Sequence, residues 1–523
     1  MMKTYLFILL CGMSAMLTSC MKELGNYDYV EVNALTIDSI RSTNITQFDT
    51  LRVTPTIKQT LESDESNLEF LWYWYKAGDE KRIIDTLSFD RNLRFYAAAE
   101  PGLYNVRLKV TDRKTGLFAR KEFDVSVESD NSGILILSNL NGKANLSILN
   151  FAQLFFQDVY YAANGEYAGE NPVAVVDVDH QPTEMHYVAI MCNDKQGGVV
   201  IDPIMFRKDG TFSSLFYSTP QKIAPQAYAA SFGEYTSGRQ INYDFIINAG
   251  KLYNRDFYNA GSAGVLLFRP EIVGDYELSP YSFVNGNTLL FYDNKNYCFQ
   301  IMPCRSGQIQ VSKFTMPPIA DDMDITKMSF DPSKVGLELL YGGEGWKKES
   351  SGVATGYGIF RKPGSQSLSD MYCLKFKIGS KMSYPPSPTY GEYFVPYFKN
   401  PITRAENLEK AEAYALSKKD PYLYYAYKNK IYSYDLEYDV AKEIYDTDTV
   451  VGAGARVDYM YFRPGINADY SLKMWAASSI EGSTTKTGSV HVLQMGRNGD
   501  VIKVDTVYQN VCGKVVSMSY KNR

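Results

Sequence analysis

Two acidic segments of the chain gather side chains that could bind a metal. Residues 177–186, Asp-Val-Asp-His-Gln-Pro-Thr-Glu-Met-His, hold the densest set of possible ligands. A metal site needs several such groups converging in space, and no known ligand spacing fits this segment, so we interpret it as polar loop and strand. Residues 321–324, Asp-Asp-Met-Asp, lack the glycine and terminal glutamate of a calcium loop. We therefore expect neither a metal nor a cofactor.

A third segment resembles part of a catalytic motif. Residues 483–488, Ser-Thr-Thr-Lys-Thr-Gly, contain both Ser-x-x-Lys and Lys-Thr-Gly. In penicillin-recognising enzymes these elements lie far apart in sequence and converge in the fold. Here they share Lys486 within an expected turn, so we interpret the match as coincidental. The sequence has no Gly-x-Ser-x-Gly and only 3 His, which favours a non-catalytic protein, whereas its 59 acidic residues keep paired-carboxylate catalysis as an alternative.

The elements that position any such site are expected to be strands. The chain has 523 residues, enough for two to four domains, with 42 Tyr, 27 Phe and 14% aromatic residues overall. Aromatic side chains pack well on a pleated surface, so this composition favours β-sheet over disorder, coiled coil or a multi-span membrane protein. The net charge of -5 argues against a nucleic-acid partner.

The amino terminus predicts export and lipid anchoring. Lys3 precedes an apolar stretch that ends in Leu-Thr-Ser-Cys at residues 17–20. This ending resembles the lipobox of bacterial lipoproteins, which implies a signal peptide over residues 1–19 and a lipid anchor on Cys20, followed by a tether over 20–30. An ordinary secretory signal is the alternative. The Lys-Glu pair at residues 22–23 resembles a surface-export signal of Bacteroidota lipoproteins, which implies the outer membrane and its outward face.

The remaining cysteines predict no disulfide framework. Five cysteines remain besides Cys11 and Cys20, and no CxxC occurs. Cys298 and Cys304 could pair across a hairpin, but buried free thiols are the favoured interpretation.

Residues 31–129 show the short alternating strands of an antiparallel sandwich. Phe70, Trp72 and Trp74 fall on one face of a strand, and the later run Pro-Gly-Leu-Tyr-Asn-Val-Arg-Leu-Lys-Val-Thr-Asp at 101–112 has a period-two apolar face. Together these segments resemble the PKD (polycystic kidney disease) repeat, an immunoglobulin-like sandwich. We expect Trp72, Trp74 and Tyr104 to pack in its core, and we expect the domain to act as a spacer.

Residues 130–523 repeat one pattern, an apolar strand, a short turn and a second apolar strand. Seven such units recur with the spacing of propeller blades, which predicts an all-β chain: a PKD-like sandwich followed by a seven-bladed β-propeller. Six or eight blades, or a pair of sandwiches, are the alternatives. The units contain residues 134–137 with 146–149, 188–191 with 198–201, 244–247 with 252–253, 289–292 with 297–299, 337–341 with 358–360 and 372–374, 422–427 with 431–434, and 473–477 with 490–493.

Two segments interrupt this pattern. Residues 150–163 predict a short helix with Phe151, Leu154, Phe155 and Val159 on one stripe. Residues 380–420 predict a long insertion that ends in a helix, because Thr-Arg-Ala-Glu at 403–406 has capping-box spacing and Ala411 to Leu416 are good helix formers.

The insertion also supplies four of the five predicted ligand-binding residues, and Trp346 lies before it in the sequence. Aromatic side chains among prolines form a rigid surface on which sugar rings or peptides can stack. Packing of these aromatics onto the propeller is the alternative. The candidate binding residues are Trp346, Tyr384, Tyr390, Tyr393 and Tyr397.

The whole chain resembles the PKD-like family lipoproteins of Bacteroidota. That resemblance implies an accessory of Sus-type (starch-utilisation-system) nutrient uptake, whose partners are a TonB-dependent transporter and its lidding lipoprotein. It carries over no functional residue except Cys20. Three hypotheses follow: a non-catalytic accessory that binds a glycan or peptide, an enzyme that degrades one and has two or three converging acidic groups, and a purely structural subunit of the uptake complex.

Overall fold

The computed structural model divides the chain into two compact units. Unit 1 comprises residues 1–44, 50–95 and 102–126, and unit 2 comprises 45–49, 96–101 and 127–523. No helix among the described residues is long and apolar enough to cross a membrane. The structure describes residues 31–129, 131–180, 185–229, 243–256, 267–285, 288–303, 328–344, 354–380, 392–463 and 472–522.

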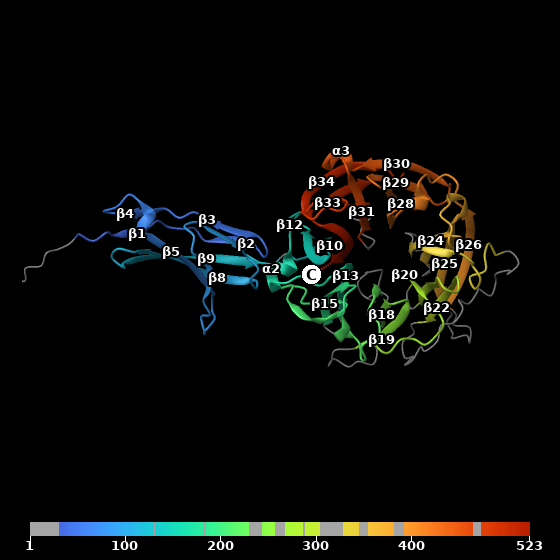
Figure 1. Cartoon of the computed structure of the whole chain (residues 1–523), viewed down its shortest axis with the longest axis horizontal. Coiled ribbons are helices and arrows are strands. Elements are labelled where there is room, and N and C mark those ends of the chain that lie inside the picture. The colour runs from blue at the N-terminus through green and yellow to red at the C-terminus, as the bar shows by residue number, and fades with distance from the viewer. Residues whose placement is uncertain are drawn as a thin grey trace, which may run out of the picture. The chain divides into compact units, whose positions relative to one another are not determined.

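Unit 1 is a β-sandwich (Figure 1). Its largest sheet has five strands in the order β2-β9-β8-β5-β6, and two-stranded sheets pair β1 with β4 and β3 with β7. The elements are β1 (Leu35–Ile37), β2 (Thr43–Thr46), β3 (Thr50–Val53), β4 (Ile57–Gln59), η2 (Glu65–Asn67), β5 (Leu68–Lys76), β6 (Asp85–Ser88), β7 (Leu93–Tyr96), β8 (Gly102–Asp112) and β9 (Phe118–Glu128).

The sandwich core includes three of the aromatic residues that the sequence singled out. Trp72, Trp74 and Tyr104 are buried. Trp74 stacks on Tyr104 of β8, with ring centroids 4.3 Å apart, and meets Phe95 of β7 edge-on at 4.9 Å. Aromatic pairs of this kind contribute beyond their buried area. The expected packing role of Trp72, Trp74 and Tyr104 is therefore confirmed.

Unit 2 contains seven antiparallel sheets among its described residues, which we number as blades. Blade 1 has the order β12-β11-β10-β35, and blades 2 to 7 are β13–β16, β17–β19, β20–β22, β23–β26, β27–β30 and β31–β34. The strands of blades 1 to 3 are β10 (Gly133–Leu140), β11 (Lys143–Asn150), β12 (Phe155–Phe156), β35 (Lys514–Lys521), β13 (Pro172–His180), β14 (Met185–Cys192), β15 (Gly198–Ile201), β16 (Lys208–Thr211), β17 (Pro225–Ala229), β18 (Tyr243–Asn248) and β19 (Lys251–Asp256).

The later blades repeat the same arrangement. Their strands are β20 (Leu278–Asn285), β21 (Thr288–Asp293), β22 (Cys298–Pro303), β23 (Glu338–Glu344), β24 (Ala354–Arg361), β25 (Met371–Ser380), β26 (Glu392–Pro401), β27 (Ala413–Leu416), β28 (Tyr422–Tyr427), β29 (Lys430–Asp435), β30 (Val440–Asp446), β31 (Ala455–Phe462), β32 (Lys473–Ile480), β33 (Gly488–Met495) and β34 (Val501–Cys512). Short helical turns are α2 (Val159–Asn164), η4 (Phe212–Leu215), η6 (Leu368–Asp370), η7 (Leu408–Lys410) and α3 (Asp448–Val451).

The seven sheets close into a ring. The innermost strands β13, β17, β20, β23, β27, β31 and β35 each contact the next, and β35 contacts β13. The last strand, β35, completes blade 1 by pairing with β10, so that Gly133 lies opposite Lys521. Figure 1 shows the ends of unit 2 meeting in the red and teal blade. This closure defines a seven-bladed β-propeller, as the sequence predicted.

The propeller core lies between neighbouring blades. On β10, Leu135 and Leu137 pack in the cluster shared with blade 2, whereas Ile134 and Ile136 pack in the cluster shared with blade 7. Successive side chains of a strand point to opposite faces, and here both faces are covered. That is why the middle strands of the blades are almost continuously apolar, and why the predicted hairpin units coincide with them.

The two predicted helices are largely wrong. Residues 150–163 contain the short strand β12, and the helix α2 begins only at Val159, so Phe151, Leu154 and Phe155 form no helical stripe. Residues 380–420 contain β26 and β27 rather than an insertion that ends in a helix. Ala413, Ala415 and Leu416 are buried as the innermost strand of blade 6. Pairing and burial there override the helix propensity of alanine and leucine.

Tyrosines from three innermost strands meet in the middle of unit 2. The Tyr341 ring lies edge-on to Tyr281 at 5.1 Å and stacks on Tyr414 at 5.3 Å. The Tyr341 hydroxyl accepts a hydrogen bond from the Leu416 backbone N–H at 3.1 Å. Burial is the main cause that raises the pKa of Tyr281 to about 12. Many of the tyrosines that distinguish the composition therefore fill the fold.

A buried ionic network joins blades 2 and 3. Arg255 of β19 is 1% exposed, and its Nε donates to Asp244 Oδ2 at 3.0 Å. Its Nη2 donates to the hydroxyls of Tyr187 and Tyr228, each at 2.6 Å. Tyr228 also donates to Asp244 at 2.8 Å. Buried charges need paired, hydrogen-bonded partners, and this cluster supplies them from strands of both blades. We call it the Arg255 network.

Candidate binding pocket

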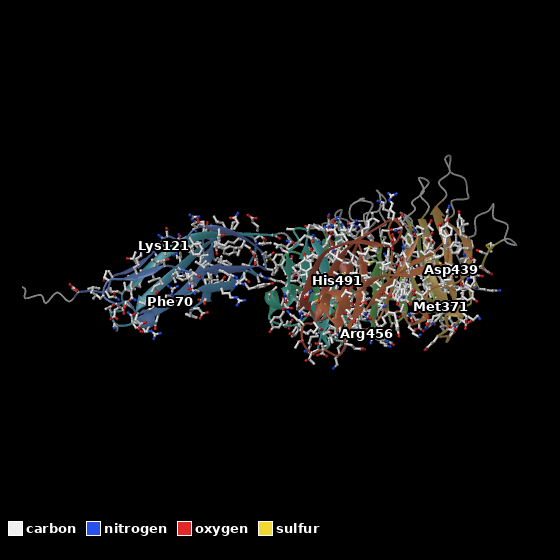
Figure 2. The ribbon with its side chains drawn as sticks, turned by 90° about the horizontal axis from the view of Figure 1, so that it is seen from above. Phe70, Lys121, Met371, Asp439, Arg456 and His491 are labelled. Atoms are coloured by element: carbon white, nitrogen blue, oxygen red, sulfur yellow. The ribbon has the colours of Figure 1, made fainter. Side chains whose placement is uncertain are left out.

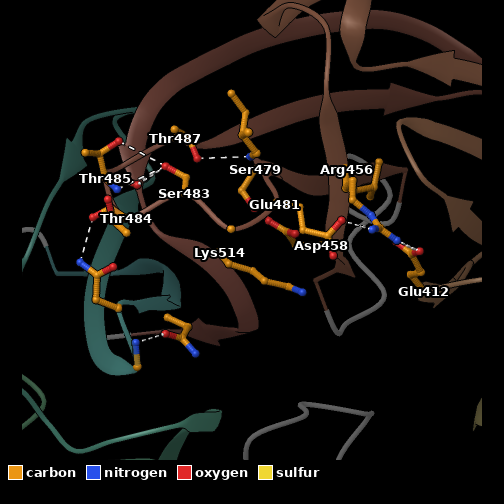
Figure 3. A pocket seen from close by; sticks show the side chains of 16 residues that line it. Glu412, Arg456, Asp458, Ser479, Glu481, Ser483, Thr484, Thr485, Thr487 and Lys514 are labelled. Atoms are coloured by element: carbon orange, nitrogen blue, oxygen red, sulfur yellow. Dashed lines mark hydrogen bonds and ion pairs between the residues drawn. The ribbon is translucent and has the colours of Figure 1, made fainter.

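A polar pocket lies in unit 2 where blade 7 meets blade 1 (Figure 3). Its volume is about 590 Å³, within the range of small-molecule sites. Figure 2 labels Arg456, one of its residues, and His491, which lies in the same blade. The pocket is lined by Asn139, Asn141, Gly142, Glu412, Arg456, Val457, Asp458, Ser479, Ile480, Glu481, Gly482, Ser483, Thr484, Thr485, Thr487 and Lys514.

Tight turns and strand ends bring these residues together. Asn141 and Gly142 both have positive φ, 56° and 79°, and form the two-residue turn between β10 and β11. Asn-Gly is the sequence favoured for such a turn, because both positions tolerate positive φ. Arg456 and Asp458 stand at the start of β31, and Lys514 begins β35. The turn between β32 and β33 supplies the remaining wall.

Arg456 holds two carboxylates of the pocket in place. Its guanidinium pairs with Glu412, just before β27, and with Glu481, just after β32. The Nε–Oε2 distance to Glu412 is 3.1 Å. Hydrogen bonds from Glu412 and then Glu481 raise the pKa of Arg456, so the guanidinium stays charged. This cluster, the Arg456 clamp, orients both glutamates and offsets their charge with one cation.

Asp458 is the unusual group of the pocket. Burial is the main cause that raises its pKa to about 7, although Ser479, Lys514 and the Val515 backbone N–H act in the opposite direction. Its Oδ2 atom is buried and has no hydrogen-bond partner among the described residues. A carboxyl group in this state can donate or accept a hydrogen bond near neutral pH. Asp458 therefore brings an unsatisfied buried polar atom to the wall of the pocket.

Lys514 supplies a second group to the wall of the pocket. It is exposed, and it forms no ion pair with a carboxylate in the part of the chain that the structure describes. Its charge still acts on Asp458. Figure 3 shows both side chains at the same cavity.

The turn at residues 483–488 is ordered by its own hydrogen bonds. The Ser483 hydroxyl accepts from the Thr485 backbone N–H at 3.2 Å, and Asn141 Nδ2 donates to the Thr484 carbonyl at 2.8 Å across the blade junction. Lys486 pairs with Asp158 and donates to Gln157 Oε1 at 3.0 Å, rather than to the Ser483 hydroxyl. The segment therefore forms a wall of the pocket and not a Ser-Lys catalytic pair.

Among the aromatic residues predicted to bind a ligand, Tyr397 has a described side chain, and it does not line this pocket. Tyr397 is 46% exposed on β26, with Lys377 Nζ 4.9 Å from its ring centroid. Tyr393 lies in β26, and the position of its side chain is not described. The remaining predicted residues lie outside the described residues, namely Cys20, Trp346, Tyr384 and Tyr390.

The two acidic segments supply no metal site among the described residues. His186 Nε2 lies 2.9 Å from Asp177 Oδ1, although the residue directly opposite His186 on β13 is Asp179. Residues 181–184 and 321–324 lie outside the described residues. Cys192, Cys298, Cys373 and Cys512 are buried free thiols, as expected, whereas Cys304 lies outside the described residues.

The sequence interpretation missed the pocket because its charged residues come from distant segments. Glu412, Arg456 and Lys514 each look like a solvated surface charge when taken alone. One signal was present: Asp458 interrupts the otherwise largely apolar strand Ala455–Phe462. A carboxylate inside such a strand indicates either a buried partner or a site.

The amino-terminal region carries a PKD-like family domain. The model of the PKD-like family matches residues 20–172, from Cys20 through unit 1 to the start of blade 2. No curated protein matches the sequence.

Solved structures resemble the chain weakly. One is a quinonprotein alcohol dehydrogenase-like protein from Bacteroides thetaiotaomicron, with 11% identity, coverage of 92% of this chain and 96% of the other, and a TM-score of 0.43. A putative phosphatase from Bacteroides thetaiotaomicron has 8% identity, coverage of 85% and 94%, and a TM-score of 0.31. A chain of the mitotic checkpoint complex has 9% identity, coverage of 57% and 89%, and a TM-score of 0.27. The propeller assignment rests on the sheet order and ring closure.

Proposed function

We propose that this chain is a lipid-anchored accessory of the outer-membrane surface that binds a glycan in the pocket between blades 7 and 1. The pocket carries the proposal, because carboxylates, amides and hydroxyls line it and none of the described residues that line it is aromatic. Sugar hydroxyls can both donate to and accept from such groups, whereas peptide side chains would also need apolar contact. A glycan is therefore favoured over a peptide.

The anchoring part of the proposal rests on the amino terminus. The lipobox-like ending places Cys20 after an apolar signal segment, and the PKD-like match begins at the same residue. Anchored in this way, the chain would hold a nutrient near a TonB-dependent transporter and its lidding lipoprotein. Replacing Cys20 by Ser should release the protein from the membrane fraction.

The binding proposal is tested with the mature chain on immobilised glycans and peptides. We expect retention on at least one glycan class, with at least tenfold weaker affinity in Asp458→Ala. Tyr397→Ala, a surface substitution outside the pocket, is the matched control and should bind like the parent protein. Absence of retention on every glycan, or retention unaffected by substitution of the pocket, would contradict the proposal.

An enzyme is the second candidate, because one observation favours it. Glu412, Asp458 and Glu481 line the same cavity, and a general acid works best when its pKa is near the operating pH, as that of Asp458 is. Against this, the two glutamates are both bound to Arg456. Release of new reducing ends from a glycan panel, abolished by Asp458→Asn, would favour the enzyme.

Docking on the transporter does not require the pocket. Mild detergent extraction followed by pull-down of the native protein should recover transporter components if the chain belongs to an uptake complex. Recovery of those components without any glycan affinity would favour the purely structural subunit.

A further inference from the structure

We propose that the pocket selects an acidic sugar, a hydroxylated ring bearing a carboxylate, whose carboxylate contacts Lys514 and Asp458. This inference rests on the proposed glycan-binding function and names its ligand class. It follows from which charges of the pocket are already paired and which are not.

The pairing within the pocket leaves one cation available. Arg456 is bound by Glu412 and Glu481, so this cation and these two anions interact mainly with each other. Lys514, at the start of β35, has no carboxylate within ion-pair distance among the described residues. An incoming carboxylate would meet an ammonium group that need not give up an existing partner.

Asp458 also favours a ligand that bears a carboxylate. The charged or polar groups that act on it are Lys514 of β35, Glu412 before β27 and Ser479 of β32, besides the Val515 backbone N–H. Because burial raises its pKa to about 7, the carboxyl group holds a proton for much of the time near neutrality. In that form the carboxyl group of Asp458, which lines the cavity, carries no charge that would repel a ligand carboxylate and has a proton to donate.

The rest of the wall suits a sugar ring. Asn139 and Ser479 place amide and hydroxyl groups at the cavity, and Thr487 lies on the adjacent turn. Asn139 Oδ1 accepts from the Gly142 backbone N–H at 2.8 Å, which leaves its amide NH₂ for a ligand oxygen. A peptide carboxyl terminus would use Lys514 equally well but has fewer hydroxyl groups for this wall.

The experiment measures binding of two matched probes to the mature full-length chain. Tetragalacturonate supplies four carboxylates, and its methyl-esterified form keeps the ring hydroxyls but removes the charge. We expect the acid form to bind at least tenfold more tightly than the ester. Lys514→Gln should weaken the acid form about tenfold and leave the ester unchanged. Lys503→Gln, an exposed lysine of blade 7 outside the pocket, is the control.

The outcomes separate this inference from the proposed function. Equal binding of acid and ester, or a Lys514-independent preference for the acid, overturns the inference and leaves glycan binding intact. Binding of neutral glycans alone does the same. Lys514-dependent binding of a peptide carboxyl terminus with no sugar bound overturns both. Asp458→Asn, which keeps the shape and cannot ionise, should retain the acid preference, and loss of that preference would contradict the assigned contacts.

Discussion

Arg255 and Arg456 hold carboxylates at different blade junctions, and the surroundings of the two arginines differ sharply. Arg255 and Asp244 have side chains 1% and 2% exposed, and two tyrosine hydroxyls complete their hydrogen bonds. Arg456 and Glu412 are about one-third exposed, and Glu481 is 70% exposed. The first group is sealed between blades 2 and 3, and the second borders a cavity.

The difference indicates what each arginine does. Removing one partner of a buried ion pair leaves the other charge uncompensated in the protein interior, where water cannot solvate it. When an exposed ion pair is broken, water solvates the remaining charge. The Arg255 network should therefore act mainly on stability. The Arg456 clamp should contribute little to stability and mainly shape the charge that a ligand meets.

The largest effect is expected at the sealed junction. Arg255→Met should lower the free energy of unfolding of the propeller by about 3–5 kcal/mol, because Asp244 would stay buried without its cation. Urea unfolding followed by tryptophan and tyrosine fluorescence measures it. Adding Asp244→Leu should recover part of the loss. A loss below about 1 kcal/mol in Arg255→Met would contradict the comparison.

The dependence of stability on pH compares two buried groups of blade 7, Asp458 of the pocket and His491. Burial lowers the pKa of His491 to about 4, so this residue binds a proton more readily in the unfolded chain than in the folded one. The stability of the folded chain therefore falls as the pH drops below 6.5, the ordinary pKa of histidine. The pKa of Asp458 is raised to about 7, so this residue loses its proton at a lower pH in the unfolded chain than in the folded one. The stability of the folded chain therefore falls as the pH rises from about 4 to 7. Each effect amounts to about 3 kcal/mol over this window, and the two oppose.

Asp458→Asn should expose the His491 contribution. Relative to the parent protein, the variant should gain about 3 kcal/mol of stability between pH 4 and pH 7. Unfolding free energies at pH 4, 5, 6 and 7 provide the measurement. Parallel pH profiles for variant and parent would show that Asp458 ionises as it does in water.

A smaller change is expected when one hydroxyl of the Arg255 network is removed. Tyr187→Phe should cost about 1–2 kcal/mol, since Arg255 Nη2 and the Tyr228 hydroxyl each lose a buried partner. Tyr397→Phe removes a hydroxyl from an exposed tyrosine and should leave the unfolding midpoint unchanged. Equal midpoint shifts in the two variants would contradict the distinction between sealed and exposed sites.

The smallest stability effect is expected at the clamp. Arg456→Met should change the free energy of unfolding by less than about 1 kcal/mol, because its partners are solvent-exposed. The same variant frees two glutamates at the pocket and should weaken tetragalacturonate binding more than binding of the methyl ester. A stability loss like that of Arg255→Met would show that the clamp is structural.

The fold could be predicted from the sequence to a greater extent than the site. Each predicted hairpin contains apolar strands whose two faces are both covered by neighbouring blades, and such runs are readable from residue type alone. The strand Ala413–Leu416 was predicted as helix because its propensity is local, whereas its place inside the ring is set by distant pairing. Distant pairing also sets the place of β35, because its partner β10 lies at the other end of the propeller sequence.

The pocket could not be predicted because its chemistry exists only after ring closure. Asn139, Arg456 and Lys514 are far apart in sequence, and each is ordinary for its local segment. The burial that raises the pKa of Asp458 comes from its surroundings in the closed fold, which no local pattern encodes. The aromatic prediction relied on residue type alone, and its described member, Tyr397, stands on a different blade.

The pairing of β35 with β10 has a kinetic consequence. Hairpins such as β32–β33 join residues close in sequence and can form early, but the contact between Gly133 and Lys521 must wait until the carboxyl-terminal strand is available. Until then β10 presents an unpaired edge to any other strand nearby. Folding should therefore show fast local phases and one slow closing phase, and the unclosed intermediate should be the species most prone to aggregate.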